Sequence, residues 1–222
     1  PADAKWLSPI EREALQGAFD REASSGRKEK HFGAALKDVR VYILAMISFG
    51  FTMGSYGIGI WLPQMLKGHG MSVTQTGWLS AVPYFFATIA LLWWAKRVDR
   101  RGGAIANLAA GLLIGAVALG VSTHFHQLGP ALLGVTLALI GTIAGRTIFY
   151  TLPARFLSGQ AAAGGLALIN SIGALGGFAG PYLVGYLKDS FGTFTAGMMG
   201  LAIVLGITTL LTLSLYAFNR DQ

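Results

Sequence analysis

Six long stretches of the chain are almost free of charge, and they constrain the fold more than any other feature. Each contains 20 or more consecutive, mainly apolar residues, and together they hold one charged residue, Arg146. An α-helix rises about 1.5 Å per residue, so a run of this length crosses the roughly 30 Å hydrocarbon core of a bilayer. The sequence therefore predicts an all-α membrane protein with six transmembrane helices, at about 41–66, 73–95, 104–123, 130–152, 162–187 and 193–217.

The composition supports a membrane protein and removes several classes of site. Charged residues make up 12% of the chain, against about 25% in an ordinary soluble domain. The chain has no cysteine, which excludes disulfides, zinc–thiolate sites and thiol nucleophiles. The net charge is +7, but the basic residues cluster beside the apolar runs. We therefore expect contact with the lipid bilayer and no nucleic-acid partner.

The basic residues lie almost entirely on one side of the predicted helices. Fourteen of the seventeen Lys and Arg residues precede the first run, join the second to the third, or follow the fourth and sixth. Lys67 and Lys188 lie on the other side. Because short loops rich in Lys and Arg stay in the cytoplasm, we expect both termini of this segment to be cytoplasmic, in a multi-pass protein of the inner or plasma membrane.

The charged start of the chain is predicted to lie outside the bilayer. Ser8 and Glu11 have the spacing of a capping box, with Pro9 at the first helical position, which predicts a short amphipathic helix to about Glu22. The linker "SSGRKEK" follows. The predicted domains are a cytoplasmic connector over 1–39, a six-span bundle over 40–218 and a cytoplasmic tail over 219–222.

The chain begins at Pro1, without methionine, on a basic segment that is typical of an interdomain connector. Six spans after such a connector are typical of the second half of a twelve-span transporter, with two three-helix inverted repeats inside the half. We therefore expect a carboxyl-terminal six-helix bundle that works with a missing amino-terminal six-helix half.

Glycine pairs spaced four residues apart recur in the predicted helices. Residues four apart share one helix face, and glycine on that face lets two backbones approach closely. We expect these glycines to pack helices together rather than to contact a ligand. The pairs are Gly50 and Gly54, Gly111 and Gly115, Gly141 and Gly145, and Gly173 and Gly177.

The segment "AKRVDRRGGA", from Ala95 to Ala104, joins the second and third predicted helices on the basic side. Asp99, Arg100 and Gly102 match the centre of the loop signature of the major facilitator superfamily, and Ala95 stands where that signature begins with glycine. The segment therefore resembles this signature. The resemblance implies that these three residues belong to a cytoplasmic gate loop. A basic turn that merely follows the charge rule for cytoplasmic loops is the alternative.

A longer resemblance covers the whole chain. The segment "RFLSGQAAAGGLALINSIGALGGFAGPYLVGYLKDSFG", from Arg155 to Gly192, together with "YGIGIWLPQML" and "PADAKWLS", is similar to the carboxyl half of the anion:cation symporter branch of the superfamily. The resemblance implies uptake of small organic anions, such as sugar acids, tartrate or aromatic carboxylates, usually with protons and by alternating access. We expect neither an enzymatic activity nor a cofactor.

Polar residues inside the predicted spans carry the functional prediction, because burial in lipid without a partner costs several kcal/mol. Asn170 and Arg146 lie at matching depth, roughly 6 and 7 Å to the cytoplasmic side of their span midpoints. Tyr150 shares a helix face with Arg146, and Thr147 follows Arg146 directly. Tyr56 lies near the middle of the first span. We predict that these five residues bind the substrate, and the resemblance implies that the asparagine of "INS", Asn170, faces the bound anion.

Three of these residues have alternative interpretations. The Arg146 side chain is long enough to reach the cytoplasmic interface of the bilayer. As a cavity residue it instead offers a planar, permanently charged fork that suits a carboxylate. Asn170 is also suited to a hydrogen bond between helices, and Tyr56 to packing in the core.

Acidic residues and histidines lie outside the predicted spans. This half therefore has no buried carboxylate to carry a proton. If the carrier is coupled to protons, as the resemblance implies, the coupling acids belong to the missing half. His124 and His126 form a pair without further ligands nearby in the sequence, so we expect no metal site.

Two other functions are alternatives to a transporter half. Ser171 follows a deep polar residue, as an intramembrane nucleophile would, but no predicted span contains the histidine base that such catalysis needs. A self-contained six-span channel or membrane scaffold that oligomerises is the second alternative. The leading prediction is the carboxyl-terminal half of a secondary active transporter for small organic anions.

Overall fold

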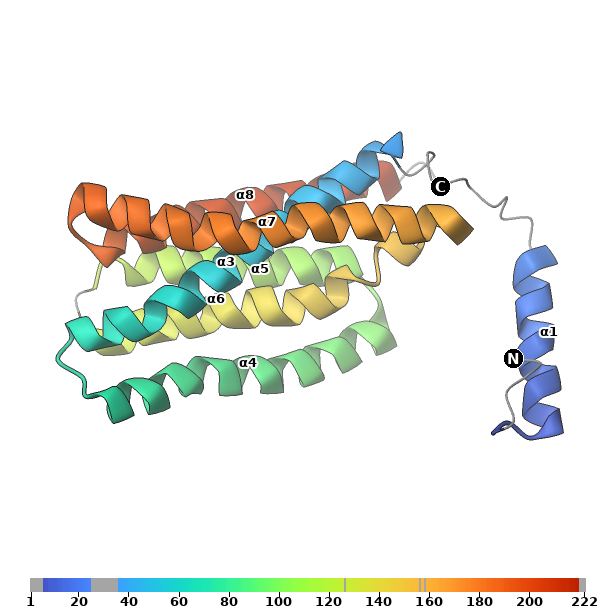
Figure 1. Ribbon diagram of the computed structural model, residues 1–222, viewed down its shortest axis with the longest axis horizontal. Helices are drawn as coiled ribbons and strands as arrows, with labels where there is room; N and C mark the ends of the chain where they lie inside the picture. The colour runs from blue at the N-terminus through green and yellow to red at the C-terminus, as the bar shows by residue number, and fades with distance from the viewer. Residues whose placement is uncertain (1–5, 25–35, 126, 156, 158, 220–222) are drawn as a thin grey trace.

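The computed structural model describes residues 6–24, 36–125, 127–155, 157 and 159–219. Every regular element in these residues is a helix. One helix stands apart at the start of the chain, and six long helices form a bundle (Figure 1). The elements are α1 Pro9–Ser24, α3 Val39–Gly68, α4 Val73–Arg101, α5 Ala104–Ser122, α6 Leu128–Phe149, the 3-10 helix η1 Pro153–Arg155, α7 Gly159–Phe191 and α8 Phe194–Asn219.

The six long helices run side by side as an antiparallel bundle (Figure 1). α3 packs against α4, α6, α7 and α8, whereas α4 lies at one edge and packs mainly against α6. The α4–α5 turn and the start of α3 lie at the same end of the bundle, together with the charged segment 96–101. We call this the basic end. The turns after α3, α5 and α7 lie at the other end.

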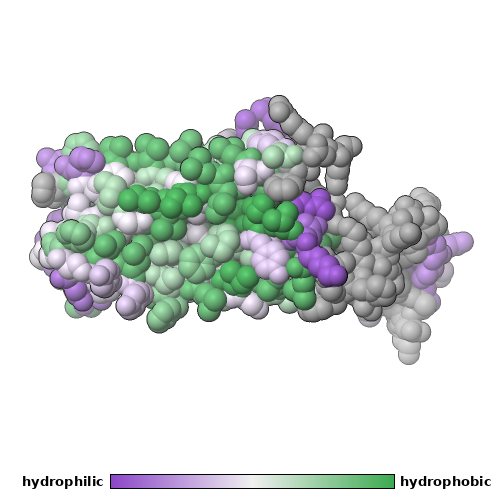
Figure 2. Space-filling model, turned by 90° about the horizontal axis from the view of Figure 1, so that it is seen from above, coloured by the Kyte–Doolittle hydropathy of each residue, from purple (hydrophilic) through white to green (hydrophobic). Residues whose placement is uncertain are grey.

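The surface of the bundle has the pattern of a membrane protein. On the face seen in Figure 2, hydrophobic residues cover most of the bundle and hydrophilic residues gather toward its two ends. Each of the six helices is long and apolar enough to cross a bilayer. The structure therefore agrees with the predicted all-α membrane bundle.

α1 begins with the reciprocal hydrogen bonds of a capping box. The Ser8 N–H donates to Glu11 Oε2 (2.9 Å), and the Glu11 N–H donates to Ser8 Oγ (3.3 Å). Donation from the Ser8 N–H, and then from its hydroxyl, holds the pKa of the Glu11 carboxyl below its usual value. The predicted linker lies outside the described residues apart from Ser24, and so do His126 and most of the predicted tail.

Most helix ends lie a few residues from the ends of the apolar runs, and those of α4, α6 and α7 differ by three residues or more. α4 continues to Arg101, past the predicted end at 95, because Lys and Arg are good helix formers and apolarity marks only the part of a helix inside lipid. α6 ends at Phe149, before the predicted end at 152. Pro153, which has no backbone N–H, starts η1 instead.

The turn between α4 and α5 is fixed by a residue that the sequence analysis did not single out. Gly102 and Gly103 have φ of 70° and 72°, a backbone region that favours glycine. Asn107 Nδ2 donates to the Gly103 carbonyl (2.9 Å), and Trp94 Nε1 donates to Asn107 Oδ1 (2.9 Å). Asn107 thus ties the turn to α4 and α5 together.

Replacing Asn107 with Leu is expected to lower the free energy of unfolding by about 1–3 kcal/mol, because the Trp94 N–H and the turn carbonyls lose their partner. Thermal unfolding of the purified protein measures this loss. The double variant with Trp94→Phe should lose less than the sum of the two single variants. Additive losses would contradict the coupling of these two side chains.

Glycines bring helix backbones into contact. An added Cβ on Gly176 of α7 would meet the carbonyl oxygen of Phe49 in α3, and one on Gly180 would meet that of Met53. All eight glycines of the predicted pairs lie against a side chain or backbone of a neighbouring helix, which confirms their packing role. Their nearest neighbours are Thr208 for Gly50, Leu205 for Gly54, Trp94 for Gly111, Ala138 for Gly115, Gly111 for Gly141, Leu108 for Gly145, Ser48 for Gly173 and Tyr56 for Gly177.

Candidate functional site

Two residues that the sequence predicts as substrate contacts are joined by a hydrogen bond. The Tyr150 hydroxyl donates to Asn170 Oδ1 across 2.6 Å, although the two residues lie 20 positions apart. Tyr150 directly follows α6, and Asn170 lies in the first half of α7. The bond therefore links the end of one membrane helix to the side of another.

Packing beneath Tyr150 fixes its position. Phe149 is fully buried and packs edge-on against Phe51 of α3, with ring centroids 5.2 Å apart. The Tyr150 ring packs edge-on against Phe149 at 5.4 Å. The Tyr150 N–H also donates to the Arg146 carbonyl (3.4 Å), which closes the last turn of α6. These contacts hold the Tyr150 hydroxyl at a defined place beside α7.

The same bond sets the orientation of the Asn170 amide. A phenol hydroxyl that donates needs an acceptor, so Oδ1 faces Tyr150 and the two amide N–H groups face away from it. Asn170 is exposed, and within the described residues its N–H groups make no hydrogen bond. The site can therefore donate two hydrogen bonds to an acceptor such as a carboxylate.

Arg146 lies one helical turn before Tyr150 and on the same side of α6. Arg146 and the adjacent Thr147 are both exposed. Arg146 belongs to the last turn of α6, where the partial negative charge of the free carbonyl groups favours a cation. Its guanidinium forms no ion pair within the part of the chain that the structure describes.

The hydrogen bond corrects the predicted depths of these residues. Because Tyr150 is level with Asn170, Arg146 lies one turn, roughly 5 Å, further into the bundle than Asn170. The sequence prediction of matching depth assumed that helix midpoints coincide. They do not: Thr142, near the middle of α6, lies beside Gly54 of α3, whereas Gly173, near the middle of α7, lies beside Ser48, six residues nearer the basic end.

Tyr56 does not join this cluster. Its ring covers Gly177 of α7, where an added Cβ would lie 3.6 Å from the ring atom Cγ. Gly177 follows Asn170 by two helical turns on the same face, so Tyr56 lies roughly 10 Å further from the basic end. Its side chain is 50% exposed, which excludes full burial in the core of this bundle.

The sequence prediction did not include a row of aromatic rings on α7. Phe178 stacks on Tyr182 with ring centroids 5.9 Å apart, and Tyr182 stacks on Tyr186 at 6.4 Å. All three side chains are more than half exposed. Their spacing of four residues along the helix is the sequence pattern from which this row could have been predicted. The row extends the exposed face of Asn170 toward the end of α7.

The predicted gate-loop residues Asp99, Arg100 and Gly102 lie at the junction of α4 and α5. Asp99 and Arg100 belong to the last turn of α4, and only Gly102 and Gly103 lie in the turn. Both charged side chains are exposed, and neither makes an ion pair among the residues described. The motif residues are therefore placed at the basic end by a rigid helix.

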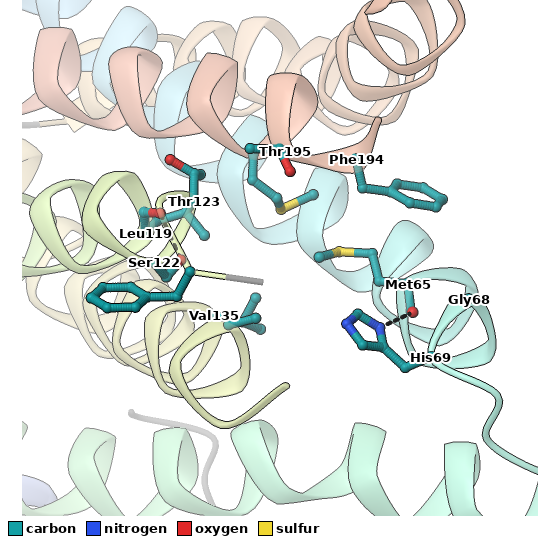
Figure 3. Close-up of a pocket in the computed structure, with 12 residues that line it drawn as sticks. Met65, Gly68, His69, Leu119, Ser122, Thr123, Val135, Phe194 and Thr195 are labelled. Carbon is teal, nitrogen blue, oxygen red and sulfur yellow. Dashed lines mark hydrogen bonds between the residues drawn. The ribbon is translucent and has the colours of Figure 1, made fainter. Parts of the chain in front are cut away.

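A cavity of about 260 Å³ opens at the other end of the bundle, between the ends of α3 and α5 and the start of α8 (Figure 3). His69 Nδ1 lies 2.9 Å from the Met65 carbonyl oxygen, which can only accept a hydrogen bond, so Nδ1 carries the proton. None of the five predicted substrate residues lines this cavity. It is distinct from the predicted site.

The described residues contain no cluster of three His, Asp or Glu side chains that could hold a metal ion. His69 and His124 lie just beyond the ends of α3 and α5, at the end of the bundle opposite to the start of α7. Ser171 is exposed on α7, next to Asn170. Neither of these two histidines therefore lies beside Ser171, which is in the half of α7 nearer the basic end.

Comparison with known proteins identifies relatives over almost the whole chain. Residues 11–221 match the sequence profile of the Major Facilitator Superfamily. A protein of Agrobacterium vitis named "Putative tartrate transporter" is 39% identical over 216 residues, which cover 97% of this chain and 50% of that protein. The "Quinolone resistance transporter" of Acinetobacter baumannii is 35% identical over 221 residues, 98% of this chain and 51% of that protein.

A third relative is the "Putative metabolite transport protein NicT" of Pseudomonas putida. It is 30% identical over 217 residues, which cover 96% of this chain and 50% of that protein. The chain thus spans about half the length of the curated relatives it matches.

Proposed function

The chain belongs to the major facilitator superfamily, and we propose that it is the carboxyl-terminal half of a secondary transporter that takes up small organic anions by alternating access. The proposed substrates are sugar acids, tartrate or aromatic carboxylates, carried together with protons. The observation that carries the proposal is the Tyr150–Asn170 hydrogen bond, which turns the amide donors of Asn170 toward the exposed face of α7.

The chemistry of the residues around this bond suits an anion. Asn170 offers two N–H donors, and Arg146, one turn deeper, offers a guanidinium that can bind a carboxylate through two parallel hydrogen bonds. Thr147 adds a hydroxyl. Tyr56 of α3 lies beside Gly177, two turns after Asn170 on α7, where it would contact the far end of the substrate. In this arrangement Tyr150 is a positioning residue for Asn170.

These residues lie on an open face of the present half. Because the chain spans about half the length of its relatives, we propose that an amino-terminal six-helix half covers this face and completes a cavity between the halves. Within the chain, α3–α5 and α6–α8 would form the two three-helix repeats. Rocking of the two halves would expose the cavity to each side of the membrane in turn.

We place the basic end in the cytoplasm of the inner or plasma membrane, because positively charged ends are retained there. Residues 1–39 would then connect the two halves, with residues 40–218 forming the bundle. Asp99, Arg100 and Gly102 would contact the other half when the cytoplasmic gate closes. We assign the proton-carrying carboxylate to the amino-terminal half, since Asp99 and Asp189 lie near helix ends.

Replacing Asn170 with Ala in the full carrier, the chain joined to its other half, is expected to raise the apparent substrate constant about tenfold. Loss of hydrogen bonds to a charged group costs about 1.5–3 kcal/mol. The measurement is uptake of labelled tartrate, a sugar acid and an aromatic carboxylate into proteoliposomes. Tyr150→Phe should give a smaller rise, because the amide stays but loses its orientation.

Ser171→Ala is the matched control, since Ser171 is the next exposed polar residue on α7 and does not bond to Tyr150. We expect its uptake kinetics to equal those of the unchanged carrier. Unchanged kinetics in Asn170→Ala would remove Asn170 from the site. Symmetric homo-oligomers of this chain that conduct without another half would contradict the carrier itself.

A further inference from the structure

The outer face of α4 combines aromatic, aliphatic and basic side chains in one continuous stripe. At the basic end, a pocket of about 270 Å³ is lined by Trp93, Lys96, Arg97, Arg100 and Arg101. Successive residues of this set are one or three positions apart, and Trp93, Arg97 and Arg101 are four apart, so they share one side of the helix. The stripe continues toward the middle of the helix through exposed apolar side chains, which are Ile89, Phe86, Phe85 and Val82.

The position of α4 in the bundle leaves this stripe exposed. α4 lies at the edge of the bundle and is the least buried of the six membrane helices. Trp93 is 62% exposed and points outward, whereas its neighbour Trp94 turns inward to bond with Asn107. The Arg97 guanidinium lies 5.8 Å from the centre of the Trp93 ring. Trp93 therefore marks the level at which the apolar stripe meets the charged pocket, which is the level tryptophan prefers at a membrane interface.

Four cations within six residues repel one another unless an anion lies between them. Among the residues that the structure describes, none of the four forms an ion pair. Asp99, the acid within this segment, does not line the pocket. Guanidinium groups bind phosphate oxygens through paired hydrogen bonds, and a lysine adds a point charge. The pocket has the charge and donors for a phosphate group.

We propose that this stripe is a binding site for an anionic phospholipid, with the phosphate in the pocket at Lys96, Arg97 and Arg101 and an acyl chain along the apolar part of α4. The occupant is a lipid rather than a free phosphate because the pocket and the apolar stripe are continuous along one helix face. The site is separate from the proposed substrate residues, which lie on α3, α6 and α7. Arg100 lines the same pocket, but we assign it to the proposed gate and not to phosphate binding.

The test uses the full carrier in nanodiscs that contain phosphatidylcholine and a minor fraction of headgroup-proximal, spin-labelled lipid. Quenching at Trp93 is the fluorescence difference between the carrier and its Trp93→Phe variant. We expect labelled phosphatidylglycerol to quench Trp93 several-fold more than labelled phosphatidylcholine at equal mole fraction. In the triple variant Lys96→Gln, Arg97→Gln, Arg101→Gln the preference should fall to the part that Arg100 alone supplies, since each basic residue at an anionic surface is worth roughly a fivefold factor.

Trp78 supplies the internal control, because it is exposed on the same helix at the opposite end. Its quenching should show no preference for phosphatidylglycerol. The charge-preserving variant Arg97→Lys, Arg101→Lys should lose part of the preference, and full retention would indicate diffuse surface charge and overturn a built site. A second outcome would also overturn the proposal: Trp93 shows no preference, and the triple variant is less stable to heat in phosphatidylcholine alone. That result would show that these cations pair with the other half.

Discussion

Replacing Gly180 with Ala is expected to lower the free energy of unfolding of the full carrier by about 3 kcal/mol, although it adds a single methyl group. The new Cβ would overlap the carbonyl oxygen of Met53 and lie 3.1 Å from the backbone nitrogen of Gly57. Both contacts are backbone atoms of α3, so no change of rotamer can make room. α3 would have to move away from α7, the helix with which it makes its most extensive contact.

Gly206→Ala is the matched control for this substitution. Gly206 lies within α8, and an added Cβ there meets nothing within 4 Å. Because alanine is a better helix former than glycine by roughly 1 kcal/mol, Gly206→Ala should leave stability unchanged or raise it slightly. Thermal unfolding in detergent compares the two variants. Equal melting temperatures for both would mean that α3 and α7 do not pack backbone against backbone.

The contrast between these glycines shows what the sequence predicts about packing. A spacing of four residues identifies glycines on one helix face, and it applies equally to Gly173 and Gly177 and to Gly176 and Gly180. Only the register of α3 against α7 decides that Gly176 and Gly180 meet backbone oxygens while Gly177 meets the ring of Tyr56. Register depends on contacts far apart in the chain, so periodicity cannot supply it.

The same limit applies to the candidate site. Polarity inside apolar runs was sufficient to select Asn170 and Tyr150, because an unpaired polar group in lipid is costly. Their hydrogen bond could not be predicted, since it depends on how far α7 extends beyond the end of α6. The charged end of α4 was assigned to a loop for a related reason: hydropathy reports the extent of the bilayer and not that of the helix.

Replacing Arg146 with Met is expected to lower kcat/KM for a carboxylate substrate about 100-fold, because removing one partner of a desolvated charge pair costs about 2–5 kcal/mol. Methionine keeps much of the length and apolar volume of the side chain, so the fold should persist. Uptake into proteoliposomes measures the rate, and thermal unfolding of the purified variant checks the fold. Substrate should raise the melting temperature of the unchanged carrier and leave that of the variant where it is.

Arg146→Lys decides between the two interpretations of this arginine. A lysine reaches the membrane interface as well as an arginine does, so a side chain that merely snorkels tolerates the change. A lysine cannot reproduce the paired hydrogen bonds of a guanidinium with a carboxylate. The position of Arg146 favours the second case, because it lies one turn deeper in the bundle than Asn170 and on the side of α6 that carries Tyr150. We therefore expect Arg146→Lys to transport poorly. Normal transport by both the Lys and the Met variant would leave anion recognition in this half to Asn170.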